Sequence, residues 1–487
     1  MPLTTTLINP NSPHTLEIDR LGRIHLYIVT KGPQVHAVGS NLAELVSASK
    51  KDLDWEAIAT FFALGFFLND KTHFKDIRIL PPATRYHLDK NYTIKGERYW
   101  EWHHTVDPHR TYDETIVEYH RLLQQAVERC TQNGHILLPI SGGLDSRSLA
   151  AVMPRHTSVQ SYSYGYTADS IEISIASQIA HSKNLPFTAH VIQRYLFDRL
   201  PEVVTALHGS QDVTQARQVS ISKWLAEHGD IVLTGLWGDV WCDQMGLADG
   251  LPENTSLAQY ACKKFRKRGS NWLLKHVVGP QLGVKDWDGW LTDRIDEGLR
   301  RFSHIEDIDF RLKAYKTSQW AFRWSNASLR AFELGATPRI PYYDNDLVDF
   351  FCTVPTEFVR DRRLQIDHLK RYAPELARIK WQQADANLYW ARYGYWLGLP
   401  RRAYQKVKRS VRGERAIQRN WELQFLSPEG RNGLEHWLLR PGLKIHEFVS
   451  PLRIKELIED LFASPRADNG YTVSILLTFS AWLEVAC

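Results

Sequence analysis

Apolar and polar residues follow two different patterns along the chain. Residues 14–30 alternate between the two kinds around Leu21-Gly22, so LEIDRLGRIHLYIV predicts a β-hairpin. A helical pattern follows over residues 55–67. Short strands with the turn-forming pair Pro81-Pro82 come next, in FKDIRILPPATRYHLDKNYTIKGERYW. The first 105 residues therefore predict a small β-rich domain.

Strands and helices alternate after residue 112. A helix over 114–130 precedes a strand over 135–140, a glycine-rich turn and a helix that reaches Met153. Further strands are expected over 158–164, 187–192 and 230–233, with helices between them. This order predicts an α/β fold with a doubly wound parallel sheet. From residue 308 the pattern is mostly helical, so residues 106–487 are expected to form a second domain.

Composition narrows the class of protein. The 487 residues are 43% hydrophobic and 24% charged, which is typical of a soluble globular chain. The net charge of +5 is mild and does not favour a nucleic-acid partner. The 5 scattered cysteines fit reduced thiols better than a disulfide framework. No signal peptide or membrane span is read, so a cytoplasmic protein without a membrane partner is expected, and a homodimer is left open.

The stretch SGGLDS, residues 141–146, follows the strand over 135–140 and opens a helix. Its two glycines permit unusual backbone angles, so successive N–H groups can point into one concavity and bind a phosphate or pyrophosphate. Asp145 would repel a bare phosphate, but Mg²⁺ could bridge the two. The ending GK[ST] of a Walker A loop is missing. A plain tight turn with a capping aspartate is the alternative.

A second turn, TGLWGD at residues 234–239, offers the same groups after another apolar strand. Both turns fall where parallel strands end, which is where such sheets bind ligands. Asp145 and Asp239 could then share Mg²⁺. An ordinary loop with an N-capping aspartate explains this second turn equally well when it is taken alone.

With these motifs, the chain resembles the asparagine synthetase family from about Tyr112 to near its C-terminus. SGGLDS is similar to the family's pyrophosphate loop, and VLTGLWGD is similar to its second loop. ATPRIPYYDNDLVDFFCTVP matches the family's R-x-P-F-L-D segment at Arg339, Pro341 and Asp344. LARIKWQ places Lys380 at the position of a lysine that stabilises adenylate formation and amidation. The resemblance implies that ATP is held by Ile140, Ser141, Gly142, Gly143, Asp145, Ser146, Tyr164, Thr234 and Gly235.

The resemblance also implies a reaction. A carboxylate would attack the α-phosphate of ATP, and pyrophosphate would leave on Mg²⁺ held by Asp145 and Asp239. An amine or ammonia would then attack the acyl-adenylate, giving an amide and AMP. The expected activity is that of an AMP-forming amide ligase whose substrate is a small molecule or a peptide.

Two departures from the family shape this expectation. Glutamine-dependent members begin Met-Cys, whereas Pro2 stands here, and proline cannot supply the thiolate nucleophile. Residues 1–105 are therefore expected to form a truncated amidotransferase-like domain of the Ntn type without glutaminase activity. Leu236 and Val240 stand where asparagine synthetases carry acidic residues. In this respect the chain resembles β-lactam synthetases and macrolactam cyclases, whose amine belongs to the substrate.

Other features leave alternatives open. Those relatives use a Tyr–Glu pair as base, and Glu333 is the candidate glutamate here, although a solvated helix face explains it as well. The basic run KKFRKR, residues 263–268, is either a solvated surface or a dock for an acidic or peptide partner. The alternative functions are a PP-loop enzyme that modifies tRNA and a non-catalytic ATP-binding scaffold.

Overall fold

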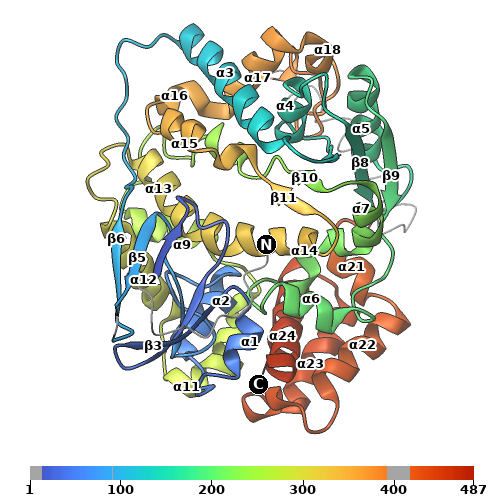
Figure 1. Cartoon of the computed structure of the whole chain (residues 1–487). Helices are drawn as coiled ribbons and strands as arrows, with labels where there is room; N and C mark the ends of the chain where they lie inside the picture. Colours follow the sequence, from blue (N-terminus) through green and yellow to red (C-terminus); the bar gives the residue numbers. More distant parts are fainter. Residues whose placement is uncertain (1–13, 90, 392–416, 487) are drawn as a thin grey trace.

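The computed structural model describes residues 14–89, 91–391 and 417–486 (Figure 1). The N-terminal region contains two three-stranded antiparallel sheets, in the orders β1-β5-β6 and β3-β2-β4. Its elements are β1 (His14–Ile18), β2 (Tyr27–Lys31), β3 (Gln34–Gly39), α1 (Leu42–Val46), α2 (Trp55–Leu64), β4 (Ile77–Ile79), β5 (Thr84–Leu88) and β6 (Ile94–Arg98). The β-rich character read from the sequence is confirmed for this region.

The predicted hairpin around Leu21-Gly22 is wrong. Strand β1 pairs with β5, whereas β2 pairs with β3 and β4 in the other sheet. The turn between them is held by a distant helix, because the side-chain amide of Asn326 donates to the carbonyls of Leu21 at 2.9 Å and Gly22 at 2.8 Å. Tertiary contacts therefore override the local alternation that favours a hairpin.

A five-stranded parallel sheet, in the order β11-β10-β7-β8-β9, forms the centre of the following region. Its elements are α3 (Tyr112–Cys130), β7 (Ile136–Pro139), α4 (Asp145–Ala151), β8 (Val159–Gly165), α5 (Ile171–Ser182), β9 (Phe187–Val191), α6 (Leu200–Ala206), α7 (Ser222–His228), β10 (Ile231–Leu233), α8 (Gly238–Trp241) and β11 (Thr337–Arg339). The predicted α/β fold is confirmed. Its fifth strand, β11, lies in a stretch for which the sequence pattern predicted helices.

Apolar side chains cover both faces of this sheet. Ile136 and Leu138 point into the main core, whereas Leu137 and Val232 pack with Leu225 of α7 in a separate cluster. A parallel sheet that is buried on both sides requires such continuous apolar runs. The strands β7 and β10 are neighbours, so the two glycine-rich turns emerge side by side.

Helices make up most of the rest. They are α9 (Leu257–Phe265), α10 (Ser270–Leu273), α11 (Gly279–Leu282), α12 (Trp287–Arg300), α13 (Ile308–Lys316), α14 (Asn326–Glu333), α15 (Asn345–Phe351), α16 (Thr356–Val359), α17 (Arg363–Tyr372), α18 (Pro374–Ala377), α21 (Asn420–Phe425), α22 (Pro428–Leu439), α23 (Pro451–Ala463) and α24 (Ala467–Ala486). Two π-helices, η3 (Leu274–Val278) and η4 (Thr317–Ser325), continue α10 and α13. The 3₁₀ segments are η1 (Val213–Gln215), η2 (Arg217–Ile221), η5 (Pro341–Tyr343), η6 (Arg360–Arg362) and η7 (Lys444–Glu447).

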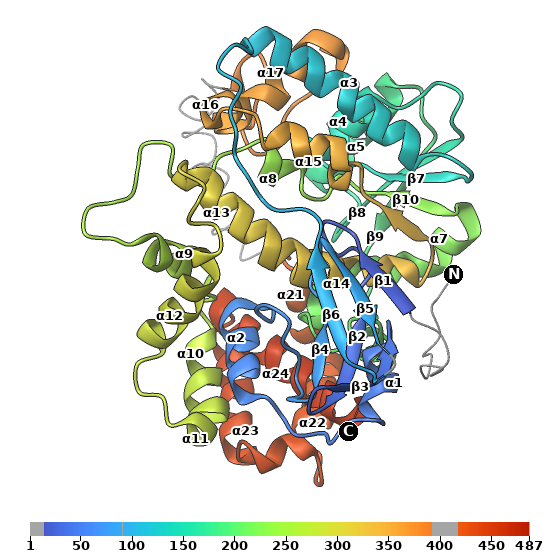
Figure 2. The same ribbon diagram turned by 60° about the vertical axis from the view of Figure 1, so that its left-hand side comes forward.

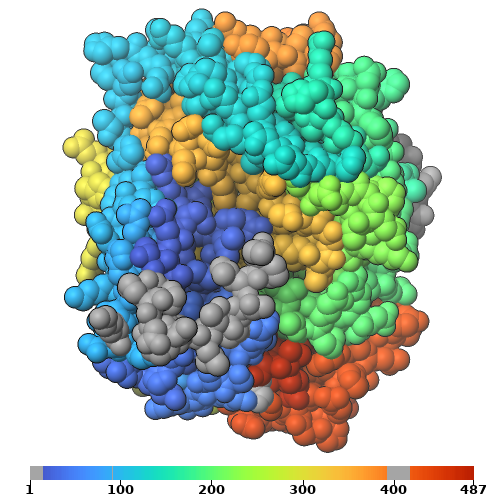
Figure 3. Space-filling view, in the orientation of Figure 1, coloured from blue at the N-terminus to red at the C-terminus, as the bar shows by residue number. Residues whose placement is uncertain are grey.

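The N-terminal region packs against the last helix, α24. Figures 1 and 2 show the N-terminal elements next to α24, and Figure 3 shows the two segments in contact on one face. One core contains Phe61 and Phe62 of α2 together with Phe479 of α24 and Leu138 of the parallel sheet. The boundary between residues 105 and 106 stays a prediction. Among the residues described, no helix combines the length and the apolar character that a membrane crossing requires.

Candidate functional site

The SGGLDS turn begins where β7 ends and closes on its own hydroxyl groups. The Ser141 N–H donates to Ser146 Oγ at 3.0 Å, and the Gly143 N–H donates to Ser141 Oγ at 3.2 Å. Ile140 anchors the turn, because its side chain is buried and its N–H donates to the Tyr162 carbonyl at 2.8 Å. The two serine hydroxyls thus accept hydrogen bonds from the loop's own N–H groups, and α4 starts at Asp145.

The second turn packs directly against the first. A Cβ on Gly235 would lie 3.0 Å from the backbone carbon of Asp145, and a Cβ on Gly238 would lie 2.8 Å from its carboxylate oxygen Oδ1. Both glycines are therefore required by close approach. Trp237 between them adopts a left-handed conformation, with φ of 76°. The structure brings Thr234, Gly235 and Asp239 to the edge of the sheet where Asp145 lies.

The Asp145 carboxylate lies in a crowded electrostatic environment. Its side chain is 26% exposed and forms an ion pair with Arg362. The Gln365 amide also donates to Asp145 Oδ1 at 3.1 Å. Burial raises the pKa of Asp145 above the usual range, Arg362 opposes that rise, and the charge of Asp239 adds to it. The charges of the two carboxylates therefore act on each other, whereas a shared metal ion stays a prediction.

Arg362 is a site residue that the sequence analysis missed. It is the last residue of η6 and adopts a left-handed conformation, with φ of 63°, next to Asp361 with φ of 56°. Such backbone strain in non-glycine residues is a feature of functional sites. Arg362 stands in a run of charged residues, 360–363, and nothing in the sequence distinguishes it from its neighbours. Only the fold brings it to Asp145.

Lys380 belongs to a segment that packs on the SGGLDS turn. The fully buried Arg147 of α4 donates to the Lys380 carbonyl at 2.7 Å, and the Gln382 N–H donates to the Gly142 carbonyl at 3.2 Å. A Cβ on Gly142 would lie 2.8 Å from Gln382 Cβ, so glycine is needed at this contact. The Lys380 side chain is 30% exposed and pairs with Asp385. The segment around Lys380 thus lies next to the loop, whereas the role of the Lys380 side chain stays a prediction.

Lys316 is a second cation that the sequence analysis missed. Its ammonium lies 5.4 Å from the ring centre of Trp237 in the second turn and 5.5 Å from that of Trp320. Burial lowers the pKa of Lys316, and the nearby charge of Asp239 partly offsets this effect. Lys316 is the last residue of α13, where the π-helix η4 begins, and π-helical segments frequently occur at functional sites.

Some of the other residues predicted from the sequence lie at the strand ends, and others lie away from the two turns. Tyr164 lies near the end of β8, with the Arg217 guanidinium 5.5 Å from its ring centre. Arg339 and Asp344 support the fold, because Arg339 donates to the Cys130 carbonyl at 3.0 Å and Asp344 pairs with Arg129. The structure does not bring Glu333 to the turns. It ends α14 ahead of the first residue of β11, at the opposite edge of the sheet, and pairs with Arg23 at 2.9 Å.

A cavity of about 1140 Å³ opens beside Arg362. Its lining combines cations and the indole ring of Trp381 with four carboxylates, those of Asp243, Glu357, Asp361 and Asp367. Trp381 directly precedes the residue that contacts Gly142, so the cavity adjoins the SGGLDS turn. Its volume suits a nucleotide or another molecule of comparable size.

Mg²⁺ fits the oxygen groups of this site. Asp145 and Asp239 are hard oxygen ligands, which Mg²⁺ prefers, and it commonly binds through one or two carboxylates plus phosphates. A divalent cation would neutralise the charges of the two carboxylates. In the protein alone, burial and the charge of Asp239 raise the pKa of Asp145. No group of three or more His, Cys, Asp or Glu side chains is arranged to hold a metal by itself within the described ranges. Phosphate oxygens would have to complete the coordination.

A parallel α/β sheet with two contacting glycine-rich turns and carboxylates at adjacent strand ends is typical of a nucleotide-binding α/β fold. Residues 118–275 match the family model described as asparagine synthase, which spans both turns. This segment is similar to the asparagine synthase family. A comparison with curated proteins found no match. The match supports a ligase-type activity that depends on ATP.

Proposed function

We propose that the protein is an AMP-forming amide ligase that activates a carboxylate with ATP. A carboxylate oxygen of the substrate attacks the α-phosphorus, the bond to the bridging oxygen breaks, and pyrophosphate leaves. A nitrogen nucleophile then attacks the acyl carbon of the adenylate. AMP departs with the electron pair of the C–O bond, and the nitrogen loses a proton as the amide forms.

The contact between the two turns is the observation that carries this proposal. Gly238 approaches Asp145 Oδ1 so closely that no side chain fits between them. Two sets of backbone N–H groups and two carboxylates thus share one edge of the sheet. Phosphoryl chemistry depends on positioning and charge neutralisation, which is what such an edge provides.

Three cations and two carboxylates have separate roles in this proposal. Asp145 and Asp239 would hold Mg²⁺, which when bound neutralises charge on the phosphates. Arg362 neutralises Asp145 in the nucleotide-free protein and lies where a phosphate oxygen would arrive. Lys316 and Lys380 approach from opposite sides, one from α13 beside the second turn and one from the segment beside the first. Glu333 is assigned no part in the reaction.

The nitrogen in this proposal does not come from glutamine hydrolysis. Pro2 lies outside the described residues, but the cysteines of the chain can be compared. Cys130 is the first in the sequence and follows the N-terminal sheets. Burial raises the pKa of its thiol to about 11, and that of Cys242 and Cys352 to about 12. These thiols lack the low pKa of a nucleophilic cysteine.

The second turn favours an amine supplied by a substrate. Val240 is buried, and Leu236 is half-buried against the core, so neither position offers a carboxylate to an incoming ammonium ion. An amine that is already part of a bound substrate does not need a carboxylate to bind it as a separate ammonium ion. Ring closure and coupling to a separate amine are therefore preferred over the formation of asparagine.

ATP–pyrophosphate exchange with a panel of carboxylates tests the proposal. The native protein should exchange label with at least one carboxylate, and Asp145→Asn should abolish the exchange while the circular dichroism spectrum stays unchanged. Asp346→Asn is the matched control, because this exposed carboxylate pairs with Arg129 away from both turns. Binding of ATP without exchange for any carboxylate would indicate a scaffold, and exchange that survives in Asp145→Asn would overturn the metal assignment.

A further inference from the structure

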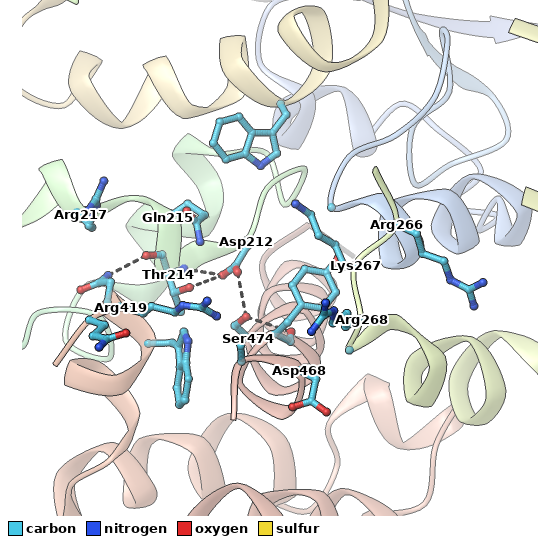
Figure 4. Close-up of a pocket in the computed structure, with 18 of the residues that line it drawn as sticks. Asp212, Thr214, Gln215, Arg217, Arg266, Lys267, Arg268, Arg419, Asp468 and Ser474 are labelled. Atoms are coloured by element: carbon cyan, nitrogen blue, oxygen red, sulfur yellow. Dashed lines mark hydrogen bonds between the residues drawn. The ribbon is translucent and has the colours of Figure 1, made fainter. Parts of the chain in front are cut away.

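A second cavity, of about 590 Å³, lies apart from the two turns. Its wall includes Gly65, which follows α2, and the loop between α9 and α10. The N-terminal parts of α21 and α24, together with η1, complete the wall (Figure 4). Five cationic residues contribute to its lining: Arg217, Arg266, Lys267, Arg268 and Arg419. Three of them belong to the basic run KKFRKR. The N-terminal region thus contributes to a strongly basic pocket.

The two acidic residues of the lining do not neutralise these cations. Asp212 is buried and already accepts hydrogen bonds from the Thr214 N–H at 2.8 Å and from Ser474 Oγ at 3.0 Å. Asp468 pairs with Arg466 at 3.3 Å. The neutral donors of Thr214 and Ser474 leave the charge of Asp212 in place, and Arg266 pairs with Asp288 outside the lining. The four remaining cations still outnumber the two carboxylates of the lining, so the pocket retains an excess of positive charge.

Lys267 is the most unusual of the five. No carboxylate of the described residues comes within 4.0 Å of its ammonium, which instead lies 4.7 Å from the ring centre of Trp320. Burial lowers the pKa of Lys267, and the nearby charge of Asp212 partly offsets this effect. A half-buried ammonium that lacks an ion-pair partner favours an external anion. Arg268, which is exposed, likewise has no carboxylate partner in the described ranges.

The pocket is connected to the site of the two turns by contacting side chains. Lys316 lies over both Trp237 of the second turn and Trp320, and Lys267 lies over the same Trp320. Trp320 also packs on Trp324 of the lining, with ring centres 5.9 Å apart. On the other side, Arg217 of the lining covers the Tyr164 ring. A ligand in this pocket would thus lie at the end of the sheet where β8 and β10 terminate, close to Tyr164 and Trp237.

We propose that this cavity binds a carboxylate- or phosphate-bearing part of the substrate, distinct from the carboxylate that is activated. Lys267 and Arg268 would donate charge-assisted hydrogen bonds to it, and Trp324 and Trp421 would form apolar walls beside it. This inference rests on the proposed ligase function, because it assigns the pocket to the substrate of that reaction. It also gives the N-terminal region a role, since Gly65 forms part of the wall.

Calorimetric titration with inorganic phosphate and with tricarballylate tests the pocket directly. The titrations are made on the full chain saturated with α,β-methylene-ATP, so that the two turns are occupied. One anion-binding event should remain, and Lys267→Met and Arg268→Gln should each weaken it by about tenfold, as expected for loss of a charge-assisted contact. Lys263→Met is the matched control, because this lysine is exposed on α9 and outside the lining.

The outcomes separate this inference from the proposed function. If the ATP analogue binds but no further anion does, or if both variants bind anions like the native protein, the pocket assignment is wrong and the ligase proposal stands. If the analogue itself does not bind, the ligase proposal fails, and the same titrations without it decide whether Lys267 and Arg268 hold an anion. Tighter binding of phosphate would assign a phosphate-bearing substrate, and tighter binding of tricarballylate a carboxylate-bearing one. Arg268→Gln, at an exposed position, keeps the test valid if Lys267→Met does not fold.

Discussion

The carboxylate of Asp145 is bound by two side chains from the segment around α17. Arg362 pairs with it, and the Gln365 amide donates to it at 3.1 Å, while Gln365 also donates to the buried hydroxyl of Tyr342 at 3.3 Å. Arg362 donates to Oδ1 of Asp145, an oxygen atom that a divalent cation would also use. The guanidinium and the cation must therefore compete for one carboxylate, since each weakens the binding of the other.

This competition gives a prediction for metal binding. Arg362→Gln should tighten the binding of Mn²⁺ to the nucleotide-free protein by about tenfold, because removal of a charge-assisted partner frees Asp145. Mn²⁺ titration followed by electron paramagnetic resonance measures this directly. Arg363→Gln is the control, because its guanidinium lies 3.9 Å from the Tyr112 ring centre and does not contact Asp145. Unchanged or weaker Mn²⁺ binding in Arg362→Gln would show that the two do not compete.

A single methyl group at Gly238 should separate the two turns. The added Cβ would lie 2.6 Å from Cε2 of Tyr342, whose buried ring cannot move freely because its hydroxyl bonds Tyr119 at 3.1 Å. Gly238→Ala should lower the free energy of unfolding by about 1–3 kcal/mol, as overpacking does, and should reduce ATP binding. Urea unfolding and nucleotide titration measure the two effects. Gly143→Ala is the comparison, because its Cβ would meet only Ser141 Oγ, at 3.3 Å, and equal losses in the two variants would contradict this account.

At the scale of elements, the sequence allowed the core of the site to be predicted. The strands β7 and β10 are short, wholly apolar and followed by glycine, which is a strong local signal for buried parallel strands. The two turns inherit their positions from these strands, so Asp145 and Asp239 could be placed together without a structure. The match at residues 118–275 covers the same elements.

The remaining features depend on contacts that no local pattern encodes. Strands β1 and β2 separate because Asn326 holds the turn between them, and Asn326 lies far along the chain. The three-residue strand β11 is too short to leave a period-two pattern. Arg362 and Lys316 reach the site only through a left-handed turn and a π-helix, respectively. Glu333 was chosen by its residue type, which carries no information about the edge of the sheet on which it lies.

Helix α13 fixes the segment that follows the second turn. The buried Asp309 carboxylate in its first turn accepts the N–H of Met245 at 2.8 Å and that of Leu247 at 2.9 Å. Asp309→Ala would leave both N–H groups unpaired, so the free energy of unfolding should fall by about 3 kcal/mol or more. Asp309→Asn keeps one acceptor oxygen and should lose about half as much. Guanidinium unfolding measures both, and equal midpoints for the two variants would show that these hydrogen bonds do not hold the segment.

At the scale of the whole molecule, buried histidines join distant parts of the chain. The Nε2–H group of His73 in the N-terminal region donates to the Gly209 carbonyl at 3.1 Å, because a carbonyl oxygen can only accept. His368 of α17 bonds His120 of α3 at 3.1 Å. Burial lowers the pKa of His73 and of His368 to about 3. Both imidazoles must therefore be neutral in the folded protein at neutral pH.

These histidines make the fold sensitive to acid. A histidine with an unfolded pKa near 6.5 and a folded pKa near 3 stabilises the fold fully above pH 6.5, and this contribution decreases as the pH falls toward 3. His73 and His368 should each lower the free energy of unfolding by roughly 2 kcal/mol as the pH falls from 7 to 5. The raised pKa of Asp145 acts in the opposite direction, because its folded form binds a proton more readily than its unfolded form.

A comparison of variants isolates the histidine contribution, because the effect of Asp145 is common to all of them and cancels in the difference. Urea unfolding at several pH values between 5 and 7 gives the slope of the unfolding free energy with pH. That slope should fall by about one proton in His368→Gln. His36→Gln, at an exposed position, should keep the native slope. If His368→Gln kept it as well, the protonation of His368 would not be linked to unfolding, and the acid sensitivity of the molecule would have to arise at other buried groups.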